Sequence, residues 1–251
     1  MAHPAVALLE SALASRKLDR TLTSALPSLE RSDPSACVAT DVAGLDERLH
    51  GGVPRGELSE ITGPRSSART TLLLQLMAAA TARGELVALV DTCDCLDVAS
   101  AAAAGVDLER MLWVRGQAIA GPLLADRAVE RALKALNLIL QAGGFGVVAI
   151  DLADVPPAAL RRLPFTTWLR VHRAIEGRDT ACVLVTGEPV ARSAGGLTLS
   201  LTGRAAWAGE AACSRRLEGV DLTVRVVSPR RRVHGDVTVR TRVVEDTCQP
   251  M

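Results

Sequence analysis

The pattern of apolar and polar positions changes character at Val38. From there on, short apolar runs are separated by longer segments in which apolar residues recur every three or four positions. The short runs predict the buried strands Leu58–Thr62, Leu86–Asp91, Met111–Arg115, Val147–Asp151 and Ala181–Thr186. The longer segments predict the helices Thr70–Arg83, Val98–Ala104, Leu123–Ala142 and Pro157–Glu176. This alternation predicts an α/β fold, with a mainly parallel twisted sheet flanked by helices on both faces.

The two ends of the chain follow other patterns. Residues 4–26 carry apolar residues at helical spacing, Pro27 ends that pattern, and the polar stretch 28–35 is typical of a linker. Three segments near the other end alternate apolar with polar residues, which predicts antiparallel strands: Leu197–Thr202, Asp221–Ser228 and Val233–Val244. We therefore expect an N-terminal helical segment with its linker, residues 1–35, and one core domain, residues 36–251.

The net charge is small but unevenly spread. The 29 basic and 28 acidic side chains give a formal charge of +1, which argues against a protein whose main task is to neutralise a phosphate backbone. Residues 203–242 contain nine arginines and four acids, whereas residues 1–202 carry 20 basic and 22 acidic groups. The cluster Arg230, Arg231 and Arg232 is either a solvated turn or part of a docking face for DNA or an acidic partner.

Composition excludes several classes of protein. No run of about 18 apolar residues is present, so we expect no membrane-spanning helix and no membrane partner. The first residues lack the basic and apolar regions of a signal peptide. The six cysteines form no C-x-x-C pair and have no neighbouring histidines, which favours reduced thiols over a zinc site or a disulfide framework. We therefore expect a cytoplasmic protein that holds no metal through its cysteines.

A loop of small residues joins the first core strand to an apolar helix. It reads T-G-P-R-S-S-A-R-T-T over residues 62–71. Backbone N–H groups in such a loop, and the helix N-terminus behind it, point at a bound anion. The phosphate-loop pattern is G-x-x-x-x-G-K-[ST], so Gly63 and Thr70 are in register, but Ala68 replaces the second glycine and Arg69 the lysine. The candidate nucleotide-binding residues are Gly63, Pro64, Ser66, Ser67, Ala68, Arg69, Thr70, Thr71 and Asp151.

Two interpretations of this loop remain open. In the first, ATP and Mg²⁺ bind, Thr70 supplies a hydroxyl to the ion, and Asp151 at a strand end holds it through water. In the second, the segment is a strand-to-helix turn without a ligand. The substitutions leave both interpretations open and argue against efficient hydrolysis, because Ala68 adds a Cβ where the backbone must approach the phosphates closely. The planar fork of Arg69 also cannot simply replace a compact ammonium group between phosphates.

Further motifs accompany the loop in a fixed order. L-D-E-R-L-H-G-G-V-P-R-G precedes it over residues 45–56, V-D-T-C-D-C-L-D follows over 90–97, and G-V-D-L-E-R-M-L over 105–112. V-V-A-I-D ends at Asp151, and V-D-L-T-V-R-V-V-S covers 220–228. Together these motifs resemble the RecA core over roughly residues 38–244. The resemblance implies a RecA-like P-loop fold, with Asp151 ending the Walker B strand.

Several positions depart from the RecA pattern. The catalytic glutamate expected from the resemblance falls on Cys93, and a thiol there cannot act as the carboxylate that activates water. The neighbouring Asp94 is expected to point elsewhere. The glutamine that senses the γ-phosphate falls on Gly187 or Glu188, and both DNA-binding loops are short. We also expect no counterpart of the separate RecA C-terminal domain. The resemblance therefore implies no catalytic residues and at most a degenerate nucleotide site.

Small RecA-like proteins with a G-P-x-S-S-x-R-T loop form the ImuA family, to which this chain is similar. That resemblance implies an accessory factor of damage-induced translesion synthesis and mutagenesis. Its partners would be an ImuB-like Y-family protein, an error-prone DNA polymerase and RecA, with weak DNA binding. The alternative is an ATP-dependent RecA paralogue that binds single-stranded DNA in recombination or repair. A third interpretation is a scaffold with a different ligand in the old nucleotide cleft.

One predicted helix carries arginines close to aromatic residues. Arg161, Arg162 and Trp168 are candidates for contact with DNA or a partner, because arginine and aromatic side chains together can clamp single strands. The alternative is a helix that buries Trp168 while its arginines stay solvated, and one apolar face is enough to explain the pattern.

Overall fold

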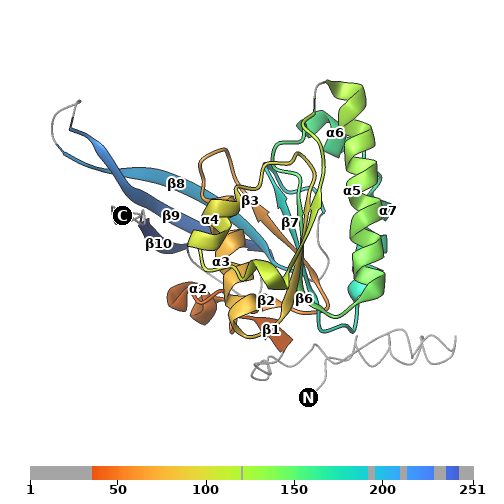
Figure 1. Ribbon diagram of the computed structural model, residues 1–251, viewed down its shortest axis with the longest axis horizontal. Coiled ribbons are helices and arrows are strands. Elements are labelled where there is room, and N and C mark those ends of the chain that lie inside the picture. The colour runs from red at the N-terminus through yellow and green to blue at the C-terminus, as the bar shows by residue number, and fades with distance from the viewer. Residues whose placement is uncertain (1–35, 120, 192–195, 210–213, 229–235, 243–251) are drawn as a thin grey trace, which may run out of the picture. The chain divides into compact units, whose positions relative to one another are not determined.

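The computed structural model describes residues 36–119, 121–191, 196–209, 214–228 and 236–242 (Figure 1). The predicted N-terminal helix and linker, and the arginines Arg230, Arg231 and Arg232, lie outside these residues. The division of the chain at residue 35 therefore remains a prediction.

A sheet of eight strands forms the centre of the fold, in the order β10-β9-β8-β3-β7-β6-β4-β5. The six strands from β8 to β5 run parallel to their neighbours, and β9 and β10 pair antiparallel at the other end. The strands are β3 (Leu58–Thr62), β4 (Leu86–Asp91), β5 (Met111–Arg115), β6 (Phe145–Asp151), β7 (Ala181–Thr186), β8 (Thr198–Ala208), β9 (Arg216–Ser228) and β10 (Asp236–Arg242). The predicted α/β class with a mainly parallel sheet is confirmed.

Helices cover both faces of the parallel part of the sheet. Helices α3 (Arg69–Ala82) and α4 (Val98–Ala103) lie on one side, and α5 (Pro122–Ala142) and α7 (Phe165–Ile175) lie on the other (Figure 1). Neighbouring residues of β4 point to opposite faces, so Leu89 packs in the cluster with α3 and Val90 in the cluster with α5 and α7. Burial on both faces explains why these strands appear in the sequence as continuous apolar runs.

The predicted helix 157–176 is wrong in one respect, because it is two helices. Helix α6 (Pro157–Arg161) ends before Pro164, and α7 begins after it. Proline has no N–H to donate and its ring clashes with the preceding turn, so it breaks a continuous helix. None of the described helices is long and apolar enough to cross a membrane.

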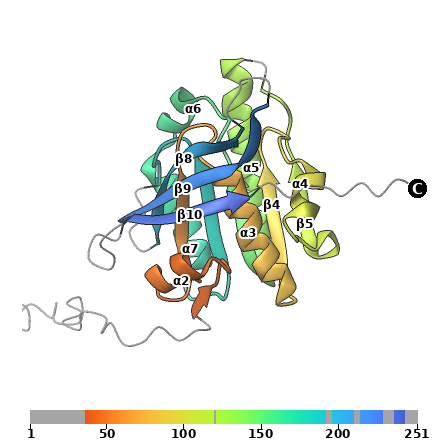
Figure 2. The same cartoon turned by 90° about the vertical axis from the view of Figure 1, so that its left-hand side faces the viewer.

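Strands β8 and β9 are longer than predicted, whereas β10 lies within the predicted range 233–244. One of the three, β8, is not purely antiparallel as predicted. Strand β8 pairs parallel with β3 on one side and antiparallel with β9 on the other. Figure 2 shows β8, β9 and β10 crossing the fold side by side. The structure also contains elements that the sequence pattern did not predict: β1 (Cys37–Val38), α2 (Ala43–Arg48), β2 (Val53–Pro54) and the 3-10 helix η3 (Leu108–Arg110).

Candidate nucleotide site

The candidate site lies where parallel strands end together. Strand β3 pairs with β7, and β7 pairs with β6, so their carboxyl ends share one edge of the sheet. The loop Gly63–Ala68 leaves β3 at this edge and leads into α3. The topology therefore brings the loop close to Asp151 at the end of β6 and Thr186 at the end of β7.

Strand β8 packs tightly on the loop. A Cβ added to Gly63 would lie 2.5 Å from the carbonyl oxygen of Leu201, and one added to Gly203 would lie 2.8 Å from that of Ser66. Both distances are too short for a real side chain, so both positions require glycine. The Ser67 hydroxyl is buried and has no hydrogen-bond partner among the described residues. The conformation of the loop is thus set by contacts with β8.

The backbone at position 68 confirms that this place suits glycine. Ala68 has φ 61° and ψ 26°, in the left-handed region. A residue with a Cβ pays about 1–2 kcal/mol for that conformation. The Ala68 methyl group packs against the hydrophobic cluster beneath α3, which offsets part of the cost. The neighbouring hydroxyl residues Thr70 and Thr71, in the first turn of α3, are exposed.

Arg69 turns inward and is held by the protein itself. The residue is only 8% exposed, and its Nη1 donates to the backbone oxygen of Thr186 at 2.9 Å. The guanidinium also acts electrostatically on Asp151, where it favours the charged form of the carboxyl group. This hydrogen bond uses one of the five N–H donors of the guanidinium and holds the group at the strand ends.

Two aspartates end adjacent strands, but their surroundings differ. Asp91, at the end of β4, accepts from the backbone N–H groups of Cys95 (3.0 Å) and Leu96 (2.8 Å) and from Trp113 Nε1 (3.3 Å). It is a structural carboxylate that shapes the loop after β4. Burial raises the pKa of Asp151 to about 6, and the charge of Asp91 adds to the rise. The Ala153 N–H donates to Asp151 Oδ1 at 2.8 Å and opposes it.

The place of the expected catalytic carboxylate is occupied by a thiol that does not ionise near neutral pH. Burial is the main cause that raises the pKa of Cys93 to about 12, and the charges of Cys95 and Asp151 contribute to the same rise. The carboxylate of Asp94 points elsewhere, since both its oxygens accept from Arg115, at 2.8 and 2.9 Å. Neither residue supplies a base that could activate water.

Ion pairs surround the space in front of the loop. A cavity of about 250 Å³ lies between the loop, the segment after β6 and the segment after β7. Arg65 pairs with Asp154 at 2.7 Å, and Arg161 pairs with Glu188 at 2.8 Å. Glu188 stands at a position where a γ-phosphate sensor was expected, and its carboxylate is used in the ion pair.

Sequence reasoning missed one residue that shapes this edge. Glu60, in the middle of β3, is fully buried, and its Oε1 accepts from the N–H groups of Val190 (2.9 Å) and Ala191 (2.8 Å). It therefore fixes the start of the segment after β7. A charged residue in the middle of a strand predicted to be buried was the available signal, because such a group is buried only when it is hydrogen-bonded.

Comparison with known proteins relates these features to a family. A family model described as the RecA N-terminal domain matches residues 24–161, more than half of the chain. The chain belongs to the RecA N-terminal domain family. It is 36% identical to Protein RecA of Nitratiruptor sp. over 129 residues and 38% identical to that of Rubrobacter xylanophilus over 130. Each match covers 51% of this chain and 35% of the relative. The chain thus spans about a third of the length of the curated relatives it matches.

The residues at this RecA-type site do not fit a hydrolysing nucleotide site. Thr70 is exposed at the start of α3, and Asp151 ends the Walker B strand as expected. Against these, Ala68 is in a left-handed conformation, Arg69 is hydrogen-bonded to the protein, and Cys93 is a protonated thiol. We derive no catalytic step through a nucleotide at this site.

The structure also bears on the two interpretations of the segment with arginines and aromatic residues. Trp168 is 3% exposed and packs in the cluster with α5, so it cannot stack on a base. Arg162 pairs with Asp126 at 2.6 Å, and Arg161 pairs with Glu188. The burial of Trp168 favours the alternative interpretation, a helix that buries one apolar face.

Proposed function

We propose that this chain is a RecA-like accessory protein of damage-induced translesion DNA synthesis, of the ImuA type, which acts in the cytoplasm through contacts with other proteins. The observation that carries the proposal is the state of Arg69. Its guanidinium is buried and bound to Thr186, at the place where the RecA pattern has a lysine for phosphate. A thiol at Cys93 in place of a carboxylate points the same way.

An exposed apolar pair offers a surface for a protein partner. Strand pairing puts Trp207 of β8 opposite Leu217 of β9, and these side chains are 56% and 39% exposed. Residues directly opposite each other across an antiparallel pair have side chains in contact range. A large exposed aromatic residue beside a leucine is typical of a contact surface. We propose that this pair contacts one of three partners: an ImuB-like Y-family protein, an error-prone DNA polymerase or RecA.

A second candidate function is supported equally by the comparisons. The curated relatives that match are RecA proteins, which favours an ATP-dependent RecA paralogue that binds single-stranded DNA. That function needs the buried Arg69 to reach the phosphates, and it needs a carboxylate other than the one that Cys93 replaces. The paralogue function therefore requires Arg69 and Asp151 for nucleotide binding, whereas the accessory function does not require them.

Complementation in cells that lack this protein tests the choice. We expect Arg69→Ala and Asp151→Ala to restore damage-induced mutagenesis as well as the natural chain does. We expect Trp207→Ala to fail and to lose the partner in a pull-down against the three proteins. Leu138→Ala on α5, which removes a side chain that is 68% exposed, is the matched control and should behave as the natural chain.

The opposite result favours the paralogue. Loss of function in Arg69→Ala and Asp151→Ala, together with a fall in recombination frequency, would show that the nucleotide site is used. Folding of each variant is checked by its thermal unfolding, so that an unstable chain is not mistaken for an inactive one.

A further inference from the structure

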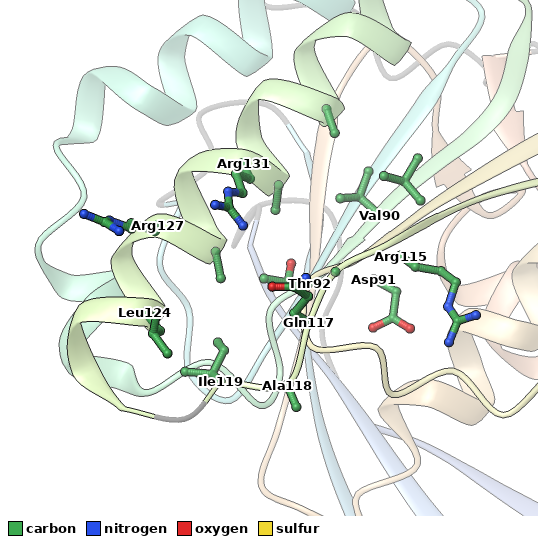
Figure 3. A pocket seen from close by; sticks show the side chains of 15 residues that line it. Val90, Asp91, Thr92, Arg115, Gln117, Ala118, Ile119, Leu124, Arg127 and Arg131 are labelled. Atoms are coloured by element: carbon green, nitrogen blue, oxygen red, sulfur yellow. The ribbon is translucent and has the colours of Figure 1, made fainter.

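The charged side chains around the cavity between α5 and the ends of β4 and β5 point in different directions. The cavity has a volume of about 310 Å³. Figure 3 shows Arg127 pointing away from it, and Asp91 on the far side of the strands together with Arg115. These three side chains therefore form no joint binding site for a ligand. Backbone groups that are free for a partner lie instead toward the other end of the sheet, on β8.

Strand β8 extends well beyond the strand that pairs with it on one side. Strand β3 pairs with only three of its residues, 198–200. The phosphate loop covers the next part of this edge, since a Cβ on Gly203 would lie 2.8 Å from the backbone oxygen of Ser66. Residues 204–208 pair with β9 alone, and here the two strands project away from the helices (Figure 1). We call residues 204–208 the open edge.

The backbone of the open edge has hydrogen-bonding groups to offer. Leu199 and Leu201 direct their backbone oxygens toward β3 and the loop after it. Because successive residues of a strand direct these groups to alternate sides, the N–H and C=O of Ala205 and Trp207 face the open side. In the part of the chain that the structure describes, no backbone hydrogen bond joins either residue to a segment other than β9. Such a row of groups is a template for a further strand.

The sequence of the open edge does little to keep another strand away. Proteins protect exposed edges with proline, with charged residues or with bulges. The open edge reads R-A-A-W-A, with one charge and no proline. The register shift beside Trp207 places the extra residue, Glu218, on β9, so the open edge itself has no bulge. A strand of another protein can therefore lie along it.

The open edge presents a different side chain on each face. Trp207 is 56% exposed beside Leu217 on one face, and Arg204, three residues earlier, is exposed on the other. Arg204 lies opposite Asp221, whose two oxygens accept from Arg240 on β10. The hydrogen bond from Arg240 lowers the pKa of Asp221, and the charge of Arg204 adds to the effect. One carboxylate thus serves two guanidinium groups, which leaves positive charge at the edge.

We propose that a partner protein adds an extended segment to the open edge as a further strand, with an acidic side chain beside Arg204 and an apolar side chain over Trp207. This rests on the function proposed above, in which Trp207 contacts a partner, and it specifies the form and chemistry of the contacting segment. Main-chain hydrogen bonds to Ala205 and Trp207 supply affinity, and the two side chains supply selectivity. Because Arg204 and Trp207 are three residues apart, the acidic and apolar residues of the segment are also three apart.

Selection from a library of random twelve-residue peptides displayed on phage, with the full chain as bait, tests the proposal. We expect the selected peptides to share an acidic and an apolar residue three positions apart. The best peptide is then synthesised in two further forms, N-methylated at one or the other set of alternate backbone nitrogens. We expect one form to bind about tenfold more weakly and the other almost unchanged, because only every second residue bonds toward β8. Fluorescence anisotropy measures the affinities.

Variants of the chain test the same contact from the other side. Ala205→Pro removes an outward N–H, which a strand edge tolerates, and should weaken peptide binding about tenfold. We expect about tenfold from Trp207→Ala as well, and about threefold from Arg204→Gln. Arg173→Gln, an exposed arginine on α7, is the matched control and should bind as the natural chain. Thermal unfolding checks that each variant is folded.

The proposal is overturned if no library peptide binds saturably, or if Ala205→Pro and both N-methylated forms leave the affinity unchanged. A pull-down of the three candidate partners with Ala205→Pro separates it from the proposed function. A partner that requires Trp207 and still binds Ala205→Pro would support the function and exclude strand addition. Peptides that bind as expected, when none of the three partners is captured, would support strand addition and exclude those partners.

Discussion

The double variant Ala68→Gly/Arg69→Lys binds ATP with Mg²⁺ more tightly than the natural chain, by about tenfold or more. Glycine removes the Cβ of Ala68 at a place where the backbone must approach the phosphates closely. Lysine frees the strand ends, because it replaces a guanidinium that is bound to Thr186 with a flexible ammonium that can reach a phosphate. A tenfold gain in affinity corresponds to about 1.4 kcal/mol of binding free energy. Equilibrium titration with a fluorescent ATP analogue measures the gain.

A second arginine of the same loop supplies the control. Arg65 is also in the loop, but its side chain is 85% exposed and pairs with Asp154 at the surface. Arg65→Lys makes the same chemical change without freeing the strand ends, so we expect less than about a twofold effect on ATP binding. An equal gain from Arg65→Lys would contradict the role given to Arg69.

Trp168→Ala lowers the free energy of unfolding by about 3–5 kcal/mol, the usual cost of truncating a large buried aromatic residue. Trp168 is 3% exposed and lies among buried residues of α5, α7 and the sheet. Such a loss is a large part of the stability of a domain of this size. Urea unfolding followed by far-UV circular dichroism measures the difference.

Phe165 provides the matched control on the same helix. It begins α7 and is 49% exposed, so Phe165→Ala should cost less than about 1 kcal/mol. If Trp168→Ala unfolds like the natural chain and instead loses affinity for single-stranded DNA, the placement of Trp168 in the core is wrong.

The strands of the parallel sheet could be predicted almost to the residue. Strands β3, β4, β5 and β7 have the predicted bounds, because a strand buried on both faces leaves a continuous apolar run between polar loops. The pair β1 and β2 could not be predicted, since two-residue strands carry no periodicity. The proline at position 164 itself indicates a helix break. The apolar residues on both sides of it continue at helical spacing, and for that reason one helix was predicted.

The geometry of the candidate site could be predicted only in part from the sequence. The alignment of Gly63, Ala68 and Thr70 with the phosphate-loop pattern follows from the local sequence. The left-handed backbone at position 68 agrees with the glycine that this pattern has there. The state of Arg69 does not follow, because its acceptor Thr186 is 117 residues away. The same holds for Glu60, whose partner Val190 lies 130 residues along the chain. Contacts of this length depend on strand order, which the sequence pattern leaves open.

The central claim is that this RecA-family chain acts without turning over ATP, and the most direct measurement is ATP hydrolysis with Mg²⁺ in the presence and absence of single-stranded DNA. We predict no turnover above background in either condition for the natural chain. Turnover that single-stranded DNA stimulates, and that Arg69→Ala and Asp151→Ala abolish, would contradict the claim and establish a RecA paralogue that uses its nucleotide site.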